Sequence, residues 1–334
     1  MRRVVIAGGA GFFGQRVVEL LRAVGVPSIT AGRSSAELGL DVEDRASLRA
    51  ALRAGDVVVD AAGPFQSRTA ALVEVACEVG ADIIDLNESL VHARRVDALA
   101  DRVRESGISV RSTCSAVSTV AAALVRRSGT LRPVRVSALV APASRETAHV
   151  GTLRALLASV GAPIEVWRDG RFAPAVGWRA SRAFALPRRP AYLVASALPL
   201  TLPRVWPSLR VVDCWTDTST PLANGVLALA ARARVLRAIA ERALPIGVAL
   251  ARLLGTRRGA FAVEVEDERG RVARLALTAA RRSYLIAAVP AALAARALAE
   301  GRSSERGIVP VDRHVDPDEL LAYLASLGIA LERA

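Results

Sequence analysis

The chain has 334 residues, of which 52% are hydrophobic and 23% charged; this composition is typical of folded globular proteins and excludes wholesale disorder. Its net charge of +13 comes from 45 basic residues that are all arginine, scattered along a chain with only 4% aromatic residues, so no nucleic-acid interface is expected. Because lysine is absent, a Schiff-base lysine and a P-loop lysine are both excluded.

The cysteines are few and widely spaced. Cys77, Cys114 and Cys214 form no CxxC pair, which argues against a disulfide framework and against a zinc site. The apolar run at the start is too short for a signal peptide, and no stretch of 18 uncharged apolar residues occurs. We therefore expect a cytoplasmic protein without a metal.

The first third of the chain alternates short apolar strands with helices. This alternation predicts a Rossmann-like, doubly wound parallel sheet in an α/β fold. The expected strands cover 3–7, 26–31, 56–61, 82–86 and 108–111, and the expected helices begin after residue 11 and cover 46–54, 67–79 and 92–105.

The pattern changes after about residue 130. Strands are expected at 133–140, 209–215, 261–266 and 272–278, with helices at 152–160 and within 223–254. The last two strands flank a turn over 267–270, which predicts an antiparallel hairpin in a mixed sheet. Helices are expected at 285–300 and 317–327.

These patterns predict three regions. They are a Rossmann domain over 1–128, a substrate and dimerisation α+β domain over 129–285, and C-terminal helices over 286–334 that pack back on the Rossmann domain. Residues 190–256 are rich in Ala, Leu, Val and Pro. They form either buried core, which we favour, or a surface that contacts lipid or a partner.

The turn between the first strand and the first helix predicts a dinucleotide site. Glycines at 8, 11 and 14 fit GxxGxxG, and those at 9, 11 and 14 fit GxGxxG. Glycine permits the tight turn, the close approach to a pyrophosphate and the close helix–strand packing, and the helix N-terminus attracts phosphate. The expected contacts are Gly8, Gly9, Ala10, Gly11, Phe12, Phe13 and Gly14.

The end of the second strand indicates NADP rather than NAD. Where an NAD site places an acid, this chain has Arg33 and Ser34. A guanidinium suits a 2′-phosphate, although Arg33 could instead be a solvated surface arginine. Asp41 and Val42 follow where a side chain could reach the adenine.

The third strand ends in small residues that let a cofactor pass close by. They are Ala61, Ala62, Gly63 and Pro64, followed by Phe65. Open α/β sheets bind ligands at this edge. Phe65 either stacks near the nicotinamide or packs in the core.

Five segments together resemble a known family. They are GGAGFFG, AGRS, DVVVDAAGPFQ, EVACEVGADIIDLNES and RSTCSAVSTVAAAL, within 1–127. They are similar to the saccharopine dehydrogenase-like NADP-binding oxidoreductases. The resemblance implies a Rossmann domain, an α+β domain that often forms a homodimer, and NADPH-dependent reduction of an imine or, in other members, a C=C bond.

The resemblance also implies candidate catalytic residues. In saccharopine-forming members an Asp after the fourth strand and a Cys after the fifth have been proposed near the reacting carbon, positions that correspond to Asp85 and Cys114. The Lys–His pair of other members cannot apply here, and Ser115 stands where a glycine usually follows the cysteine.

The residues themselves also indicate these positions, because Asp85, Glu88 and Cys114 follow strand ends beside the expected cofactor. Asp85 is either an acid with a raised pKa or a structural carboxylate that bonds a neighbouring loop. Glu88 is either a proton donor or part of a helix N-terminus, and Cys114 could be a small buried hydrophobe.

The sequence therefore predicts an NADP(H)-dependent oxidoreductase that reduces a C=N or C=C bond. The apolar second domain favours a hydrophobic substrate. The alternative is a non-catalytic NADP-binding sensor or interaction protein on a Rossmann scaffold, because no acid–base pair is evident.

Overall fold

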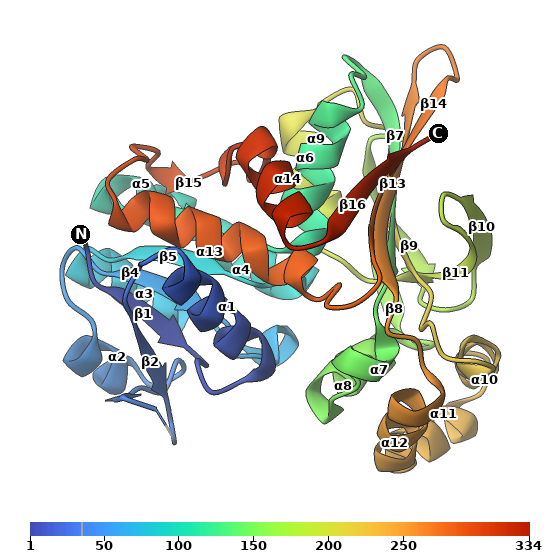
Figure 1. The fold of residues 1–334 in the computed structure, drawn as a ribbon, viewed down its shortest axis with the longest axis horizontal. Helices are drawn as coiled ribbons and strands as arrows, with labels where there is room; N and C mark the ends of the chain where they lie inside the picture. The colour runs from blue at the N-terminus through green and yellow to red at the C-terminus, as the bar shows by residue number, and fades with distance from the viewer. Residues whose placement is uncertain (35) are drawn as a thin grey trace. The chain divides into compact units, whose positions relative to one another are not determined.

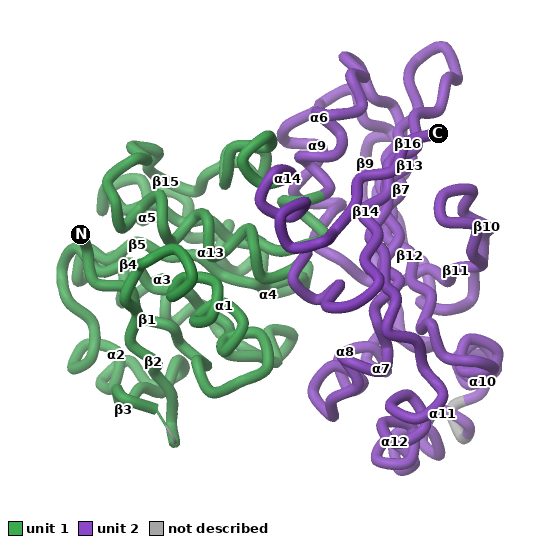
Figure 2. Tube along the Cα trace, in the orientation of Figure 1, with its two compact units in different colours: residues 1–120, 287–320 green, residues 121–286, 321–334 purple. Residues whose placement is uncertain are grey.

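The computed structural model describes residues 1–34 and 36–334, with all side chains of these except those of Arg234 and Val235. The chain divides into two compact units (Figure 2). Unit 1 comprises Met1–Val120 and Ala287–Leu320, and unit 2 comprises Ala121–Ile286 and Leu321–Ala334.

Unit 1 is built on a seven-stranded, entirely parallel sheet of order β15-β6-β5-β4-β1-β2-β3. Its strands are β1 (Val4–Ala7), β2 (Ser28–Gly32), β3 (Leu38–Gly39), β4 (Val57–Asp60), β5 (Asp82–Asp85), β6 (Ser109–Arg111) and β15 (Gly307–Ile308). Every residue of β1, β4 and β5 is buried, as expected for parallel strands covered on both faces. The Rossmann-like prediction is confirmed.

Helices cover both faces of this sheet (Figure 1). The helices α2 (Arg45–Ala51), α3 (Ala71–Val79) and α5 (Ala100–Ser106) pack on one face, and α1 (Phe12–Ala23) and α13 (Leu285–Ala299) lie on the other. The single helix expected over 92–105 is wrong, because α4 (Leu90–Asp97) ends before α5 begins. The break at Ala98 and Leu99 lets each helix bury its own valine, Val96 and Val103, in one core.

Unit 2 contains the expected mixed sheet, of nine strands. Its main order is β10-β11-β12-β7-β13-β14-β16, and β8 and β9 extend from β12. Its strands are β7 (Pro133–Ala141), β8 (Pro163–Arg168), β9 (Arg171–Val176), β10 (Ser181–Ala185), β11 (Arg188–Val194), β12 (Val211–Thr216), β13 (Gly259–Asp267), β14 (Val272–Ala279) and β16 (Ile329–Arg333). The hairpin β13–β14 is confirmed. Strands β8 to β11 were not predicted, because their prolines and arginines obscure the strand pattern.

The C-terminal region differs from its prediction. Helix α13 enters unit 1, but α14 (Pro317–Ser326) runs from unit 1 into unit 2, and β16 pairs with β14. Residues 321–334 therefore belong to the second unit, whereas the prediction grouped them with the Rossmann domain. The terminal strand was missed because it is short and ends in charged residues.

The apolar stretch 190–256 is divided between core and surface. Leu198 and Leu202 of α9 (Leu198–Val205) are fully buried, whereas α10 (Ala223–Ala230), α11 (Arg234–Arg242) and α12 (Leu244–Leu254) carry exposed apolar side chains. The other helices of unit 2 are α6 (Ala121–Arg127), α7 (Ser144–Thr147) and α8 (Val150–Ser159). Among the residues described, no helix is long and apolar enough to cross a membrane.

Candidate functional site

The site lies at the edge of the unit 1 sheet where β1, β4, β5 and β6 end. Ala7 is the register partner of Asp60, and Asp60 is the partner of Asp85, so the segments that follow these strands lie side by side. This is the edge at which open parallel sheets bind their ligands.

The glycine turn is packed so closely that side chains are excluded. Gly8 has φ +72°, and a β-carbon added to it would lie 2.8 Å from the Cα of Ala62. A β-carbon on Gly14 would lie 2.2 Å from the carbonyl oxygen of Gly8. Gly11 is the N-cap of α1 and contributes no side-chain cap. A helix N-terminus without a side-chain cap attracts anions.

The segment after β2 contains the predicted cofactor residues Arg33 and Ser34 and an acid, Glu37, that was not predicted. Arg33 and Ser34 are exposed immediately after the strand. Glu37 Oε2 accepts hydrogen bonds from the backbone N–H of Thr30 at 2.8 Å and from its hydroxyl at 2.9 Å, and these bonds lower the pKa of Glu37. Sequence analysis missed Glu37, although it follows Gly14 at roughly the 20-residue spacing typical of a ribose-binding acid.

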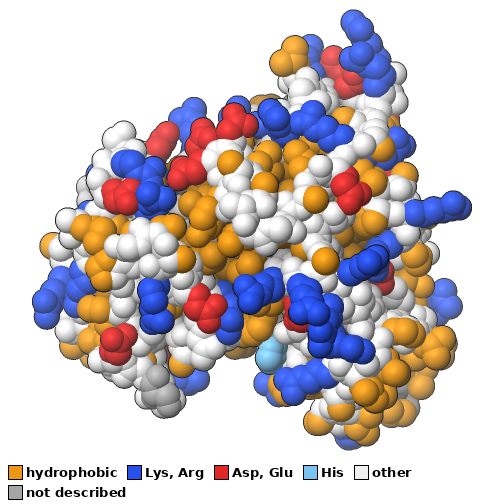
Figure 3. All heavy atoms as spheres, viewed as in Figure 1, with side chains coloured by type: hydrophobic (Ala, Val, Ile, Leu, Met, Phe, Trp, Pro, Cys, Tyr) orange, Lys and Arg blue, Asp and Glu red, His pale blue; other side chains and the backbone are white. Residues whose placement is uncertain are grey.

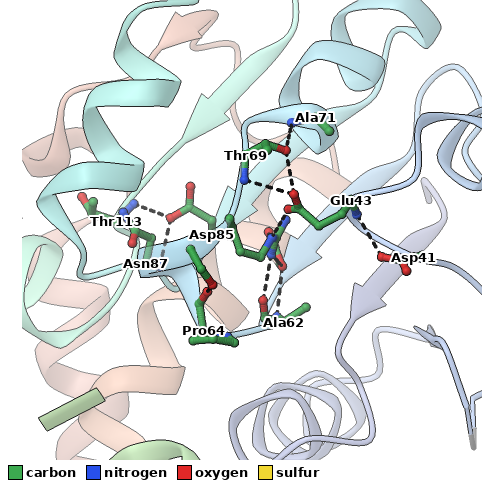
Figure 4. Close-up of polar contacts among 12 residues, drawn as sticks. Asp41, Glu43, Ala62, Pro64, Thr69, Ala71, Asp85, Asn87 and Thr113 are labelled. Carbon is green, nitrogen blue, oxygen red and sulfur yellow. Dashed lines mark hydrogen bonds and ion pairs between the residues drawn. The ribbon is translucent and has the colours of Figure 1, made fainter. Parts of the chain in front are cut away.

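Asp41 and Val42 lie beyond β3 and are half-buried. The Asp41 carboxylate accepts the Glu43 N–H at 3.0 Å, as Figure 4 shows, and Val42 packs against the sheet core. Both residues therefore order the segment that leads into α2.

A buried ion pair fixes the segment after β4. Arg68 Nη1 donates to both carboxylate oxygens of Asp60, at 3.0 and 2.8 Å, and to the carbonyl of Ala62 at 2.8 Å. Arg68 Nε donates to Glu43 at 2.9 Å, and Glu43 accepts from Thr69 (Figure 4). This segment contains the predicted cofactor residues Ala61, Ala62, Gly63, Pro64 and Phe65. The Asp60–Arg68 pair, which was not predicted, holds the backbone of the segment through the Ala62 carbonyl.

The Phe65 ring is half-buried and packs on its neighbours. Its centroid lies 5.3 Å from that of the His92 ring and 5.4 Å from Cζ of Arg68. His92 is buried, and burial lowers the pKa of its ring.

Asp85 connects the segments that follow β5 and β6. Its Oδ1 accepts the N–H groups of Asn87 at 3.0 Å and Thr113 at 2.7 Å (Figure 4). Its carbonyl accepts the Cys114 N–H at 2.8 Å. The second carboxylate oxygen, Oδ2, is buried and makes no hydrogen bond among the described residues. Burial raises the pKa of Asp85. The carboxylate thus holds a neighbouring loop through Oδ1, while the Ser112 side chain lies near it without a hydrogen bond of normal geometry to Oδ2.

Glu88 has a similar arrangement. Its Oε1 accepts the Val117 N–H at 2.8 Å, in the π-helical turn η2 (Ala116–Val120), so it supports the next helical segment rather than its own. Its Oε2 is buried and makes no hydrogen bond among the described residues. Burial raises the pKa of Glu88 to about 8, and the nearby Asp85 contributes in the same direction. At neutral pH this carboxyl therefore carries a proton.

Cys114 is fully buried, and burial raises the pKa of its thiol to about 12. Nearby, the buried Arg111 donates to Ser303, but its Nε and Nη1 atoms have no partner among the described residues. His314 is buried and hydrogen-bonded to Thr119 at 2.8 Å and to the Val309 carbonyl at 3.0 Å, and burial lowers its pKa to about 3.

Unpaired buried polar atoms are concentrated at this edge. They belong to Arg68, Asp85, Glu88, His92, Arg111, Ser112, Thr113 and Ser118. Folded proteins rarely leave such atoms without a partner, so their concentration indicates a place for a polar ligand or ordered water. No group of three or more potential metal ligands occurs among the described residues.

Fold and site together define a two-unit architecture with a Rossmann-like unit. The chain has the fold of apo saccharopine dehydrogenase (L-Glu forming) from Saccharomyces cerevisiae, with a TM-score of 0.63, 15% identity and full coverage of both chains. At this identity the likeness concerns the fold alone, and the predicted fold resemblance is confirmed at that level.

Two further structures are similar over nearly their whole length. UDP-N-acetylglucosamine 3-dehydrogenase from Acidithiobacillus ferrooxidans is 12% identical over 97% of this chain and 96% of its own, with a TM-score of 0.43. GenD2 of gentamicin A biosynthesis, in complex with NAD, is 14% identical over 100% and 96%, with a TM-score of 0.46. Both scores are too low to support an argument. Comparison of the sequence with models of protein families and with curated proteins finds no match.

Proposed function

We propose that the protein is an NADP(H)-dependent oxidoreductase that reduces a C=N or C=C bond. The observation that carries this proposal is the concentration of unpaired buried polar atoms beside a glycine turn that side chains cannot enter. A ligand with a pyrophosphate at the helix N-terminus and a reactive group near Asp85 and Glu88 would use both features.

The residues of unit 1 fit a dinucleotide. Gly8, Gly11 and Gly14 pack directly against backbone, so they hold the turn tightly at the N-terminus of α1, where a pyrophosphate would bind. We assign the 2′-phosphate to Arg33 with Ser34, the adenine to Asp41 and Val42, and the nicotinamide half to 61–65. When bound, NADPH would supply the hydride.

Glu88 is the proposed proton donor. Its carboxyl is protonated at neutral pH, and its Oε2 has no hydrogen bond of normal geometry among the described residues, although Ser115 and Ser118 lie near the carboxyl. The donor pKa of about 8 is close to a physiological operating pH, which suits general acid catalysis. Glu88 would donate its proton to the nitrogen or carbon next to the reduced carbon, and solvent would then reprotonate the carboxylate. Asp85 positions the two loops, and Cys114 lines the site as a neutral thiol.

The alternative is a non-catalytic NADP-binding protein. One observation favours it, because Asp85 and Glu88 each use one carboxylate oxygen to hold a loop. In that case both carboxylates would only hold the loops at this edge of the sheet and would take no part in catalysis.

Cofactor titration tests the proposal first. Nicotinamide fluorescence is followed with NADPH and NADH for the wild type, Arg33→Asp, Glu37→Gln and the control Arg53→Asp, an exposed residue before β4. We expect a preference for NADPH that only Arg33→Asp removes. A preference for NADH that is lost in Glu37→Gln would assign the ribose to Glu37 and overturn the choice of NADP. Binding of neither cofactor would overturn the oxidoreductase.

Turnover separates the enzyme from the sensor. Imines and conjugated carbonyl compounds with apolar substituents are screened by NADPH oxidation. An enzyme loses turnover in Glu88→Gln while NADPH binding is retained. Cofactor binding without turnover in any such screen would favour the sensor.

A further inference from the structure

Unit 2 presents a continuous group of exposed apolar side chains on three helices. The apolar face, as we call it, comprises Leu222, Val226, Leu229, Ile239, Ile246, Leu250, Leu253 and Leu254. Figure 3 shows hydrophobic side chains gathered over this part of the molecule, at the lower right. Exposed apolar residues scattered singly are normal, but a contiguous group of this size indicates an interaction surface.

Helix α12 carries two rows of apolar side chains, and only one of them is buried in the core. Leu244, Val248 and Ala251 are buried in the local core. Ile246, Leu250 and Leu253 repeat with similar helical spacing on the exposed side. A surface helix normally carries polar residues there, so the core accounts for only one of the two apolar stripes.

Leu222 is held in an unfavourable conformation at the start of α10. It has φ +62° and is 86% exposed. The preceding turn is fixed by Asn224, whose side chain accepts the Thr218 N–H at 2.9 Å and donates to Asp217 at 2.7 Å. A leucine in the left-handed region is strained and persists only where its surroundings impose it, so this side chain is held outward.

The positive charge around the apolar face indicates which kind of partner can bind there. Residues 222–258 contain seven arginines and a single acid, Glu241. Arg232, Arg242, Arg257 and Arg258 are exposed. A second copy of this chain would bring two strongly positive faces together, which is unfavourable. An anionic bilayer offers complementary charge and an apolar interior, and arginine stems can lie along its headgroups.

We propose that the apolar face of α10, α11 and α12 docks the protein on an anionic lipid surface. The leucines and isoleucines enter the boundary between headgroups and acyl chains, and the arginines bind the lipid phosphates and carboxylates. This site is independent of the proposed oxidoreductase function.

The test uses the full chain with vesicles of phosphatidylcholine alone and of phosphatidylcholine with phosphatidylserine, and measures co-sedimentation. We expect binding to the serine-containing vesicles that weakens with salt. Leu250→Ser with Leu253→Ser should weaken it about tenfold for each leucine. Arg257→Glu with Arg258→Glu should weaken it at least about fivefold for each arginine.

Matched controls come from the same unit. Leu131→Ser changes a leucine that is 92% exposed outside the apolar face, and Arg269→Glu reverses a charge in the β13–β14 turn. Both should bind like the wild type, with unchanged circular dichroism in all variants. Equal losses in controls and face variants, or no binding to anionic vesicles, would overturn the proposal. So would concentration-dependent self-association that the leucine variants abolish, because it would assign the face to a second copy.

Discussion

Replacing Glu88 by glutamine should change how the stability of the protein depends on pH. The carboxyl has a pKa of about 8 in the folded chain instead of the usual 4.5, because the fold favours its neutral form. Such a group contributes stability that is fully present below pH 4.5 and is lost as the pH rises through 8. At 1.36 kcal/mol per pH unit, the loss amounts to about 5 kcal/mol.

Glutamine retains an oxygen that can accept the Val117 N–H, but it cannot ionise. We therefore expect Glu88→Gln to match the wild type near pH 5 and to be several kcal/mol more stable near pH 9. Urea unfolding, followed by circular dichroism over this range, measures the difference. The exposed Glu105→Gln is the control and should follow the wild type. Parallel pH profiles for Glu88→Gln and the wild type would refute the assignment of a buried, protonated carboxyl.

Three further predictions concern residues of unit 1. Gly14→Ala places a β-carbon 2.2 Å from a carbonyl oxygen. It should lower the free energy of unfolding in urea by about 1–3 kcal/mol or more and abolish NADPH binding. Gly151→Ala, with open space around it, should do neither. Arg68→Met leaves the buried Asp60 carboxylate without its partner and should lower the free energy of unfolding by about 3–5 kcal/mol. The control Arg45→Met removes an exposed ion pair and should lower it by about 0–1 kcal/mol. Similar losses in the two variants would contradict the buried pair. The Cys114 thiol, with a pKa of about 12, should resist a thiol reagent at pH 8 until the chain unfolds, and rapid labelling of the native protein would disprove its burial.

Five strands and the glycine turn of unit 1 could be predicted because each carries a local signal, whereas the two-residue strands β3 and β15 are too short to carry one. The run Val57–Asp60 is apolar and short, and the glycines at 8, 11 and 14 stand at a strand–helix junction. The strands between 163 and 194 lack such a signal, since they are partly exposed and interrupted by prolines. Their pairing is decided by contacts with β12 that lie far away in the sequence.

The partners of the site residues could not be predicted for a related reason. Sequence analysis places Asp85 and Glu88 at strand ends, but it cannot show that Thr113 and Val117 donate to them across a gap of nearly thirty residues. Arg68 looked like one of many arginines, and only the fold shows that it is buried against Asp60. In a chain with 45 arginines, residue type alone carries little information about such a role.

The bridge made by Arg68 has a thermodynamic consequence for the two ends of the proposed cofactor site. Arg68 joins Asp60, at the end of β4, to Glu43, in the segment that leads into α2. A ligand that orders one segment reduces the conformational entropy left to lose in the other, so binding at the two ends is expected to be positively coupled. By linkage this coupling is reciprocal, and an adenine-side fragment should strengthen the binding of a nicotinamide-side fragment by the same factor as the reverse.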